Sequence, residues 1–312
     1  MLALAATDVA GQPNRGKPAG TRRSAPPAGT WDGVTAGTFL PDAFSTLEGQ
    51  RPVFTPGGRT LNPGSPNTVV TGSPGGGATG AFKWSSLASE DTLVDEIKDL
   101  KAAIATACGK PTDFKGGGFE EARVAFSALA VAFGVIAAYD GDVRWKKDAA
   151  TARDLFARAG FNCKVGTEQS FNESKARLED LESLLDGNSP KGKPDRDDDF
   201  RWSQVAGRPA LMNRLEQAQD AMRPAIASKA DFGGRMGDLL HAVEVVAVIG
   251  EVIRQPDFEY HDDDTYRGYA AAMRDAAAEA RAACEKKDYE AARAAVGKIE
   301  KACDACHGDY RS

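Results

Sequence analysis

The chain has 312 residues, 42% hydrophobic and 27% charged, which is typical of a soluble globular protein of one or two domains. Its formal net charge of -6 opposes non-specific nucleic-acid binding, because a phosphate polymer would be repelled, and no lysine–arginine cluster offsets that charge. The longest uncharged apolar run is VAFSALAVAFGVIAAY at residues 124–139. This run is shorter than the roughly 20 residues of a membrane-spanning helix. We therefore interpret it as a buried helix and expect no transmembrane segment.

The first 80 residues are too rich in glycine and proline to build a core. They hold 15 of the 33 glycines and 10 of the 16 prolines of the chain. The opening MLALAATDVAGQ resembles the end of a secretory signal, with small residues at Ala3 and Ala5, and an ordinary alanine-rich terminus is the alternative. We predict a signal-like start and an extended, flexible arm over residues 1–80.

The remainder of the chain consists of two related halves. FKWS at residues 82–85 recurs as FRWS at residues 200–203, a spacing of 118. The spacing drifts to 121 where Cys163 aligns with Cys284, and it returns to 118 late in each half. So many matches under such small offsets predict a tandem duplication.

Each half is predicted to form four helices. Apolar residues recur at helical spacing throughout, and β-branched alternation is absent. Four amphipathic helices with short connections favour an antiparallel up-down bundle. In the second half we expect helices at residues 211–226, 237–253, 265–286 and 288–310, with a break at Gly233-Gly234. The expected fold class is all-α: two tandem four-helix bundles at 81–187 and 200–312, joined by a polar linker at 188–199 and preceded by the arm.

The most specific motif is KACDACHGDYR at residues 301–311. Cys303 and Cys306 lie one turn apart on the inward face of the last expected helix, so two sulfurs can each bond one vinyl group of the same porphyrin. His307, the next residue, can then ligate the iron. This Cys-x-x-Cys-His pattern predicts covalent attachment of one c-type haem per chain.

Zinc and a redox dithiol are the alternatives for this motif. A structural zinc site needs a fourth ligand and usually a second paired cluster, whereas the other cysteines and histidines do not form such a pair. A thioredoxin-like dithiol is expected at a helix start after a strand, whereas this pair ends a helix in an all-helical chain.

The motif, at the end of the last helix of a four-helix unit, resembles that of the cytochrome c′ family, the class II c-type cytochromes. In that family a tyrosine or phenylalanine and a basic residue follow Cys-x-x-Cys-His. The resemblance covers residues 200–312 and, more loosely, the first half. It implies thioether bonds at Cys303 and Cys306, proximal iron ligation by His307, and a place near the proximal haem face for Arg311.

The first helix carries a second part of the family pattern. RPALM at residues 208–212 matches an arginine followed four residues later by the side chain that faces the distal side of the iron. The resemblance implies this place for Met212, and Arg208 would suit a haem propionate. High-spin members carry an apolar non-ligand there, whereas low-spin members carry a methionine, so Met212 favours low-spin iron. The alternative for Met212 is a gap-filling core residue. His241 could compete as a ligand, and we interpret it as a surface or hydrogen-bonded histidine.

The first half lacks the haem anchor. At the spacing of 118, Leu185, Asn188 and Ser189 stand at the positions of the motif's ligands, and Val94 stands at the distal position. We therefore predict a haem-free copy. Its apolar helix at residues 124–139 has no polar face, which predicts packing on more than one side, against the haem bundle, the arm or a partner.

Three further cysteines lie outside the motif. Cys163 and Cys284 occupy equivalent places, and we interpret them as buried structural residues. In an oxidising compartment Cys108 and Cys163 could form a disulfide, an alternative that the sequence leaves open.

Together these features predict a periplasmic or exported monohaem cytochrome that carries single electrons to a redox partner protein and is not an enzyme, because no acid–base pair or nucleophile accompanies the haem. Covalent haem is attached after export, so the motif implies the compartment. One alternative is a five-coordinate module that binds nitric oxide or carbon monoxide. Another is a haem subunit held in a larger assembly by its arm or first bundle. Because the family often dimerises through its first two helices, the resemblance also implies that the tandem copy replaces a second subunit.

Overall fold

The computed structural model describes residues 82–191 and 200–311, and these ranges contain helices and no strands. The expected all-α class is therefore confirmed. The predicted N-terminal arm, and most of the predicted linker, lie outside the described residues. Within the described ranges no helix has the length and apolarity needed to cross a membrane.

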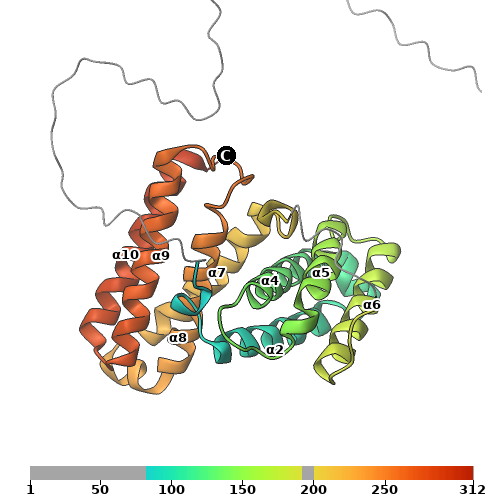
Figure 1. Cartoon of the computed structure of the whole chain (residues 1–312), viewed down its shortest axis with the longest axis horizontal. Helices are drawn as coiled ribbons and strands as arrows, with labels where there is room; N and C mark the ends of the chain where they lie inside the picture. Colours follow the sequence, from blue (N-terminus) through green and yellow to red (C-terminus); the bar gives the residue numbers. More distant parts are fainter. Residues whose placement is uncertain (1–81, 192–199, 312) are drawn as a thin grey trace, which may run out of the picture. The chain divides into compact units, whose positions relative to one another are not determined.

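The first bundle contains four main helices. Ser89 caps the first of them by accepting a hydrogen bond from the Thr92 N–H, and Thr167 and Ser170 form a capping box on the last. The second helix packs between the first and third, and the fourth packs against the first and third. The helices are α2 (Glu90–Ala107), α4 (Phe119–Ala137), α5 (Ala149–Asn162) and α6 (Glu168–Leu185), with the short α3 (Pro111–Asp113) before α4 (Figure 1).

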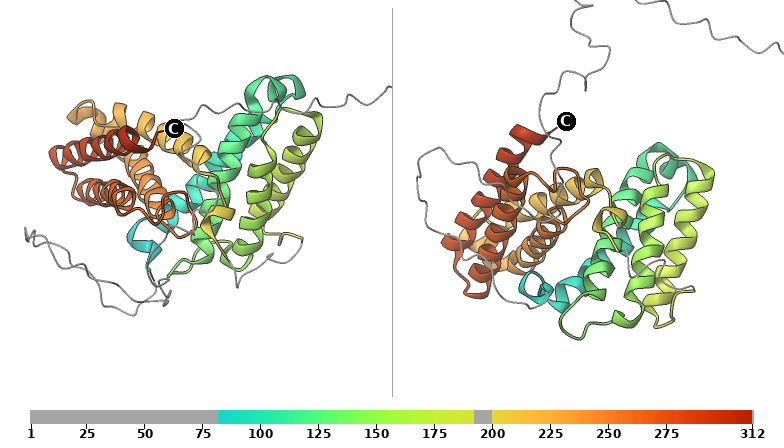
Figure 2. Two further views of the ribbon diagram at one scale, coloured as in Figure 1. Left: turned by 90° about the horizontal axis from the view of Figure 1, so that it is seen from above. Right: turned by 45° about the horizontal axis from the view of Figure 1, so that its top comes forward.

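The second bundle has the same order of elements. Three of its helices begin at capping side chains, namely Ser228, Asp263 and Asp288. Successive helices pack on one another, and both views of Figure 2 show the last helix, in red, alongside the preceding one. The helices are α7 (Arg208–Ala225), α8 (Lys229–Val252), α9 (Asp264–Glu285) and α10 (Tyr289–Tyr310).

The expected break at Gly233-Gly234 lies one residue before the interruption in the structure, and the expected start at residue 237 agrees with the helical segment after it. Helix α8 begins at Lys229, because Ser228 caps it by accepting from the Asp231 N–H, and the helix continues through both glycines. Glycine lowers helix propensity, but the cap and the apolar second half of α8 outweigh that cost. The chain instead bends one residue later, at Arg235 (φ -121, ψ 20).

The cores of the two bundles differ in side-chain size. In the first bundle Phe133 lies 5.6 Å from Phe156 and 6.4 Å from Trp145 between ring centroids. In the second bundle α9 and α10 bury mainly alanines: Ala270, Ala276, Ala277, Ala280, Ala283, Ala292 and Ala295. At the spacing of 121, Phe156 corresponds to Ala277, and both are fully buried. Aromatic rings therefore fill the first bundle at a level where the second has only methyl groups.

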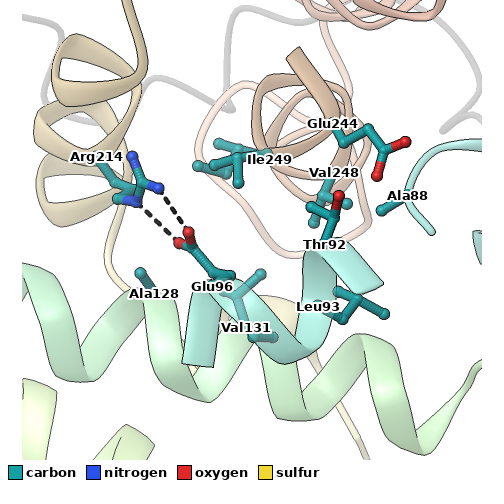
Figure 3. A pocket seen from close by; sticks show the side chains of 12 residues that line it. Ala88, Thr92, Leu93, Glu96, Ala128, Val131, Arg214, Glu244, Val248 and Ile249 are labelled. Carbon is teal, nitrogen blue, oxygen red and sulfur yellow. Dashed lines mark hydrogen bonds and ion pairs between the residues drawn. The ribbon is translucent and has the colours of Figure 1, made fainter. Parts of the chain in front are cut away.

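The two bundles contact each other through their first two main helices. Helix α4 packs against α7, and α2 packs against α8. The prediction that the apolar helix packs on more than one side is thus confirmed, with the second bundle as one neighbour. Trp84 and Trp202, which are equivalent in the two halves, contact each other with ring centroids 5.2 Å apart and ring planes tilted by 52°. A cavity of about 30 Å³, room for one water molecule, lies between the bundles (Figure 3).

Buried ion pairs cross this contact. The Arg214 guanidinium on α7 donates to both carboxylate oxygens of Glu96 on α2, at 2.9 and 2.6 Å. His241 Nε2 on α8 lies 2.7 Å from the same carboxylate. Glu244, also on α8, accepts from the backbone N–H of Ser89 at 2.8 Å and pairs with Arg281 at 3.0 Å. Buried charges need partners of this kind.

The Glu96–His241 contact predicts a pH optimum of stability. Burial opposes ionisation of Glu96, but the Arg214 charge and the hydrogen bonds together outweigh burial and lower its pKa from 4.5 to about 2. Burial likewise opposes protonation of His241, yet Glu96 raises its pKa above the ordinary 6.5. The Glu96 contribution is therefore complete above pH 4.5 and is lost as the pH falls towards 2. The His241 contribution is complete below pH 6.5 and is lost as the pH rises through the folded-state pKa.

Chemical unfolding of wild type and His241→Gln across this range checks the prediction. The stability difference between them should be largest below pH 6.5 and should shrink above it. A difference that does not change with pH would contradict it.

Candidate haem-attachment site

The three motif residues lie on the last two turns of α10. Cys303 and Cys306 are free, partly buried thiols, and His307 is exposed. Helix α10 starts at the Asp288 cap, which accepts from the Ala291 N–H, and it buries the apolar face that leads to the cysteines. The motif therefore lies on a helix, as predicted, and its two cysteines are one turn apart.

Cys303 contacts side chains from two other helices. Its sulfur accepts from Gln219 Nε2 of α7 at 3.2 Å and lies 3.8 Å from Met273 Sδ of α9. Burial, with help from Cys306, raises the pKa of this thiol to about 11. A reactive dithiol needs the opposite shift, because the thiolate is the nucleophile. The environment of Cys303 therefore disfavours the redox-dithiol interpretation.

Two side-chain contacts connect α7 with α10, and their order along the two helices is antiparallel. Arg223 pairs with Glu300 at 3.7 Å, and one turn further Gln219 meets Cys303. Continued along two straight helices, these contacts would lead to Met212 on α7 and to the end of α10, just beyond His307. Met212 also shares a helix face with Gln219, seven residues on, and packs partly buried against the core. Met212 therefore stays a candidate for the distal position.

Arg208 lies at the same end of the bundle. It pairs with Glu259 at 2.8 Å and sits 5.0 Å over the ring of Tyr260. Burial raises the pKa of the Cys306 thiol, and the nearby charge of Arg208 opposes this rise. Arg311, which follows α10 directly, is exposed, and no contact assigns it a partner at the site.

A group of four tyrosines lies beside the motif and was not predicted from the sequence. Tyr310 has ring-centroid distances of 5.0 Å to Tyr260, 5.4 Å to Tyr266 and 6.4 Å to Tyr269. The hydroxyl of Tyr310 donates to Asp263 at 2.7 Å, which raises the pKa of Tyr310 to about 12. The spacing of Tyr266 and Tyr269 on one helix was a possible signal, but only the tertiary contact with α10 joins them into a cluster.

The two remaining histidines do not face the motif. His241 is engaged by Glu96 at the contact between the bundles, which agrees with a hydrogen-bonded histidine. His261 contacts a backbone carbonyl, that of Phe258, at 2.8 Å, instead of the charged side chains around it. A zinc site would need a group of such ligands. Within residues 82–191 and 200–311, no three or more histidine, cysteine, aspartate or glutamate side chains are arranged to hold a metal ion.

The chemistry of the donor set fits a covalent haem. Both thiols are free, and His307 is not buried by other side chains. Tyr266, beside the motif, is 2% exposed; burial raises the pKa of its hydroxyl, and the neighbouring Arg208 opposes that rise.

Comparisons with known proteins agree with this site. A family model described as Cytochrome C' matches residues 258–311, from the loop before α9 to the end of the motif. No curated protein and no solved structure matches the chain. The match covers the last two helices and supports a c-type cytochrome domain there, of a family that binds haem c and transfers electrons or binds gases.

Proposed function

We propose that residues 200–312 bind one haem c through Cys303 and Cys306, with His307 and Met212 as the axial ligands, and that the protein carries single electrons in the periplasm or another exported location. The observation that supports this proposal is the pair of contacts from Gln219 to Cys303 and from Arg223 to Glu300; continued along α7, they would lead to Met212 near the last turn of α10. The haem supplies the one-electron exchange at its iron, and the protein's residues hold it, set its ligation and exclude water. A redox protein is the expected partner, through a small transient contact.

Replacing Met212 with leucine tests the proposal. In protein matured by a host that attaches c-type haem, wild type should give a low-spin spectrum with a methionine-to-iron charge-transfer band and no shift with carbon monoxide. Met212→Leu should lose that band, bind carbon monoxide, and have a lower reduction potential, because a thioether ligand raises the potential. Met222→Leu, deeper on the same helix, is the matched control and should keep the band. A wild-type spectrum that is high-spin and shifts with carbon monoxide would contradict methionine ligation.

Binding of nitric oxide or carbon monoxide at a five-coordinate iron is the second candidate. The family match to Cytochrome C' favours it as much as electron transfer, since it does not extend to α7 and so carries no information on residue 212. The carbon monoxide titration of wild type separates the two functions.

We also propose that the first bundle is a haem-free copy that arose by tandem duplication. Two pairs of equivalent residues, Trp84 with Trp202 and Glu96 with Arg214, contact each other across the interface. Such contacts between equivalent positions are the mark of a two-fold axis, as in a symmetric dimer. The aromatic core around Phe156 also supports a bundle that needs no cofactor to fill it.

A further inference from the structure

Helix α7 carries Met212 and Arg214 on opposite faces. Two residues along a helix turn the side chain by about 200°. Met212 shares the face of Gln219, which contacts Cys303 on α10. Arg214 therefore projects towards the first bundle, where Figure 3 shows it meeting Glu96 of α2 through two bonds. Any shift of α7 that breaks this ion pair also moves Met212.

The half of α7 that bears Met212 has few other polar anchors. The polar contacts of α7 with α10 lie in its second half, at Gln219, Arg223 and the carbonyl of Ile226 just beyond its end. In the first half, Arg208 pairs with Glu259, which is 58% exposed, so this ion pair is weak, and it also lies over the ring of Tyr260. Glu96 is 6% exposed and Arg214 12% exposed, so their bidentate bond is shielded from water.

Glu96 also contacts the neighbouring helix of the second bundle, α8. Its Oε2 atom contacts both Arg214 of α7, at 2.6 Å, and His241 of α8, at 2.7 Å. One carboxylate from the first bundle thus ties together the two helices that lie at the interface. Removing its charge leaves a buried guanidinium without a carboxylate partner, and Arg214 would have to turn towards solvent to be satisfied.

We propose that Glu96 of the first bundle is a positioning residue for Met212, holding α7 so that the methionine reaches the haem iron. This inference rests on the proposed His307–Met212 ligation. It assigns the first bundle a role in setting the sixth ligand of a haem that it does not bind.

The test compares Glu96→Gln with Glu244→Gln in the full-length protein with haem attached. Glu244 is a matched control, because it is also buried and crosses the same interface, but it contacts Ser89 and Arg281 and not α7. Glu96→Gln should lose most of the methionine-to-iron band and gain about tenfold in carbon monoxide affinity, whereas Glu244→Gln should keep the wild-type spectrum. Hydrogen exchange without carbon monoxide should show faster exchange of α7 amides in Glu96→Gln than in Glu244→Gln.

A conservative variant separates positioning from general loss of stability. Glu96→Asp keeps the carboxylate and should retain more of the band than Glu96→Gln. If Glu96→Gln keeps the full band, or if Glu96→Asp and Glu244→Gln lose as much of it, Glu96 is not a positioning residue. A wild-type spectrum without the band would instead overturn the proposed ligation, and this inference with it.

Discussion

A chain with Cys303→Ser and Cys306→Ser carries no covalently bound haem when it is matured beside wild type. Serine cannot form the thioether, so both attachment bonds are lost and any haem held by His307 should be removed by denaturation. The readout is haem staining on a denaturing gel, where the wild-type band should be positive and the variant band negative.

Cys163→Ser is the matched control for this experiment. It changes a free, buried cysteine of the first bundle, whose sulfur lies 3.1 Å from Ser174 Oγ. It should stain like wild type, even if the substitution lowers stability. Stain that persists in the double variant, or zinc in place of haem in the purified wild type, would contradict haem attachment at the motif.

Residues 200–312 expressed alone should self-associate or precipitate, unlike the whole chain. The fragment exposes the α7 and α8 surface that the first bundle covers, including the apolar Val245, Val248 and Ile249 that line the cavity between the bundles (Figure 3). An exposed apolar surface of this kind favours association. Sedimentation velocity of the fragment and of the whole chain measures the difference.

A chain cleaved at an inserted protease site between residues 192 and 199 is the control for the fragment. Both halves are then present, and they should sediment together because α2 and α4 still cover α7 and α8. A fragment that stays monomeric, soluble and as stable as the whole chain would show that the first bundle does not replace a second subunit.

Much of the fold could be predicted from sequence because helical periodicity and caps are local signals. The expected start of the last helix at residue 288 differs by one residue from α10, since Asp288 is a strong capping side chain. The glycines at 233 and 234 predicted the kink at Arg235 to within one residue, and the expected start at residue 237 agrees with the segment after it. The segment from Lys229 to the kink was not predicted, although the Ser228 cap is a local signal for its start.

Some residues of the site could likewise be predicted from local sequence, whereas others are brought together only by tertiary contacts. Cys303, Cys306 and His307 form a motif within five residues, so their chemistry could be predicted directly. The tyrosine cluster could not, because Tyr260 and Tyr310 come from a loop and a helix end fifty residues apart. Nor could the Glu96–Arg214 pair, since charges at equivalent positions of two copies indicate nothing until the copies are known to face each other.

The ion pair between equivalent positions also determines which molecules can associate. In a symmetric pairing of two second bundles, Arg214 would face Arg214, and in a pairing of two first bundles Glu96 would face Glu96. Like charges buried without a partner are strongly unfavourable, so this face-to-face arrangement favours one bundle of each kind. Association of isolated second bundles would then have to use the apolar surface in another arrangement. If the two halves arose by duplication, as proposed above, a change at this one position would be enough to favour pairing between unlike halves over a symmetric dimer of like ones.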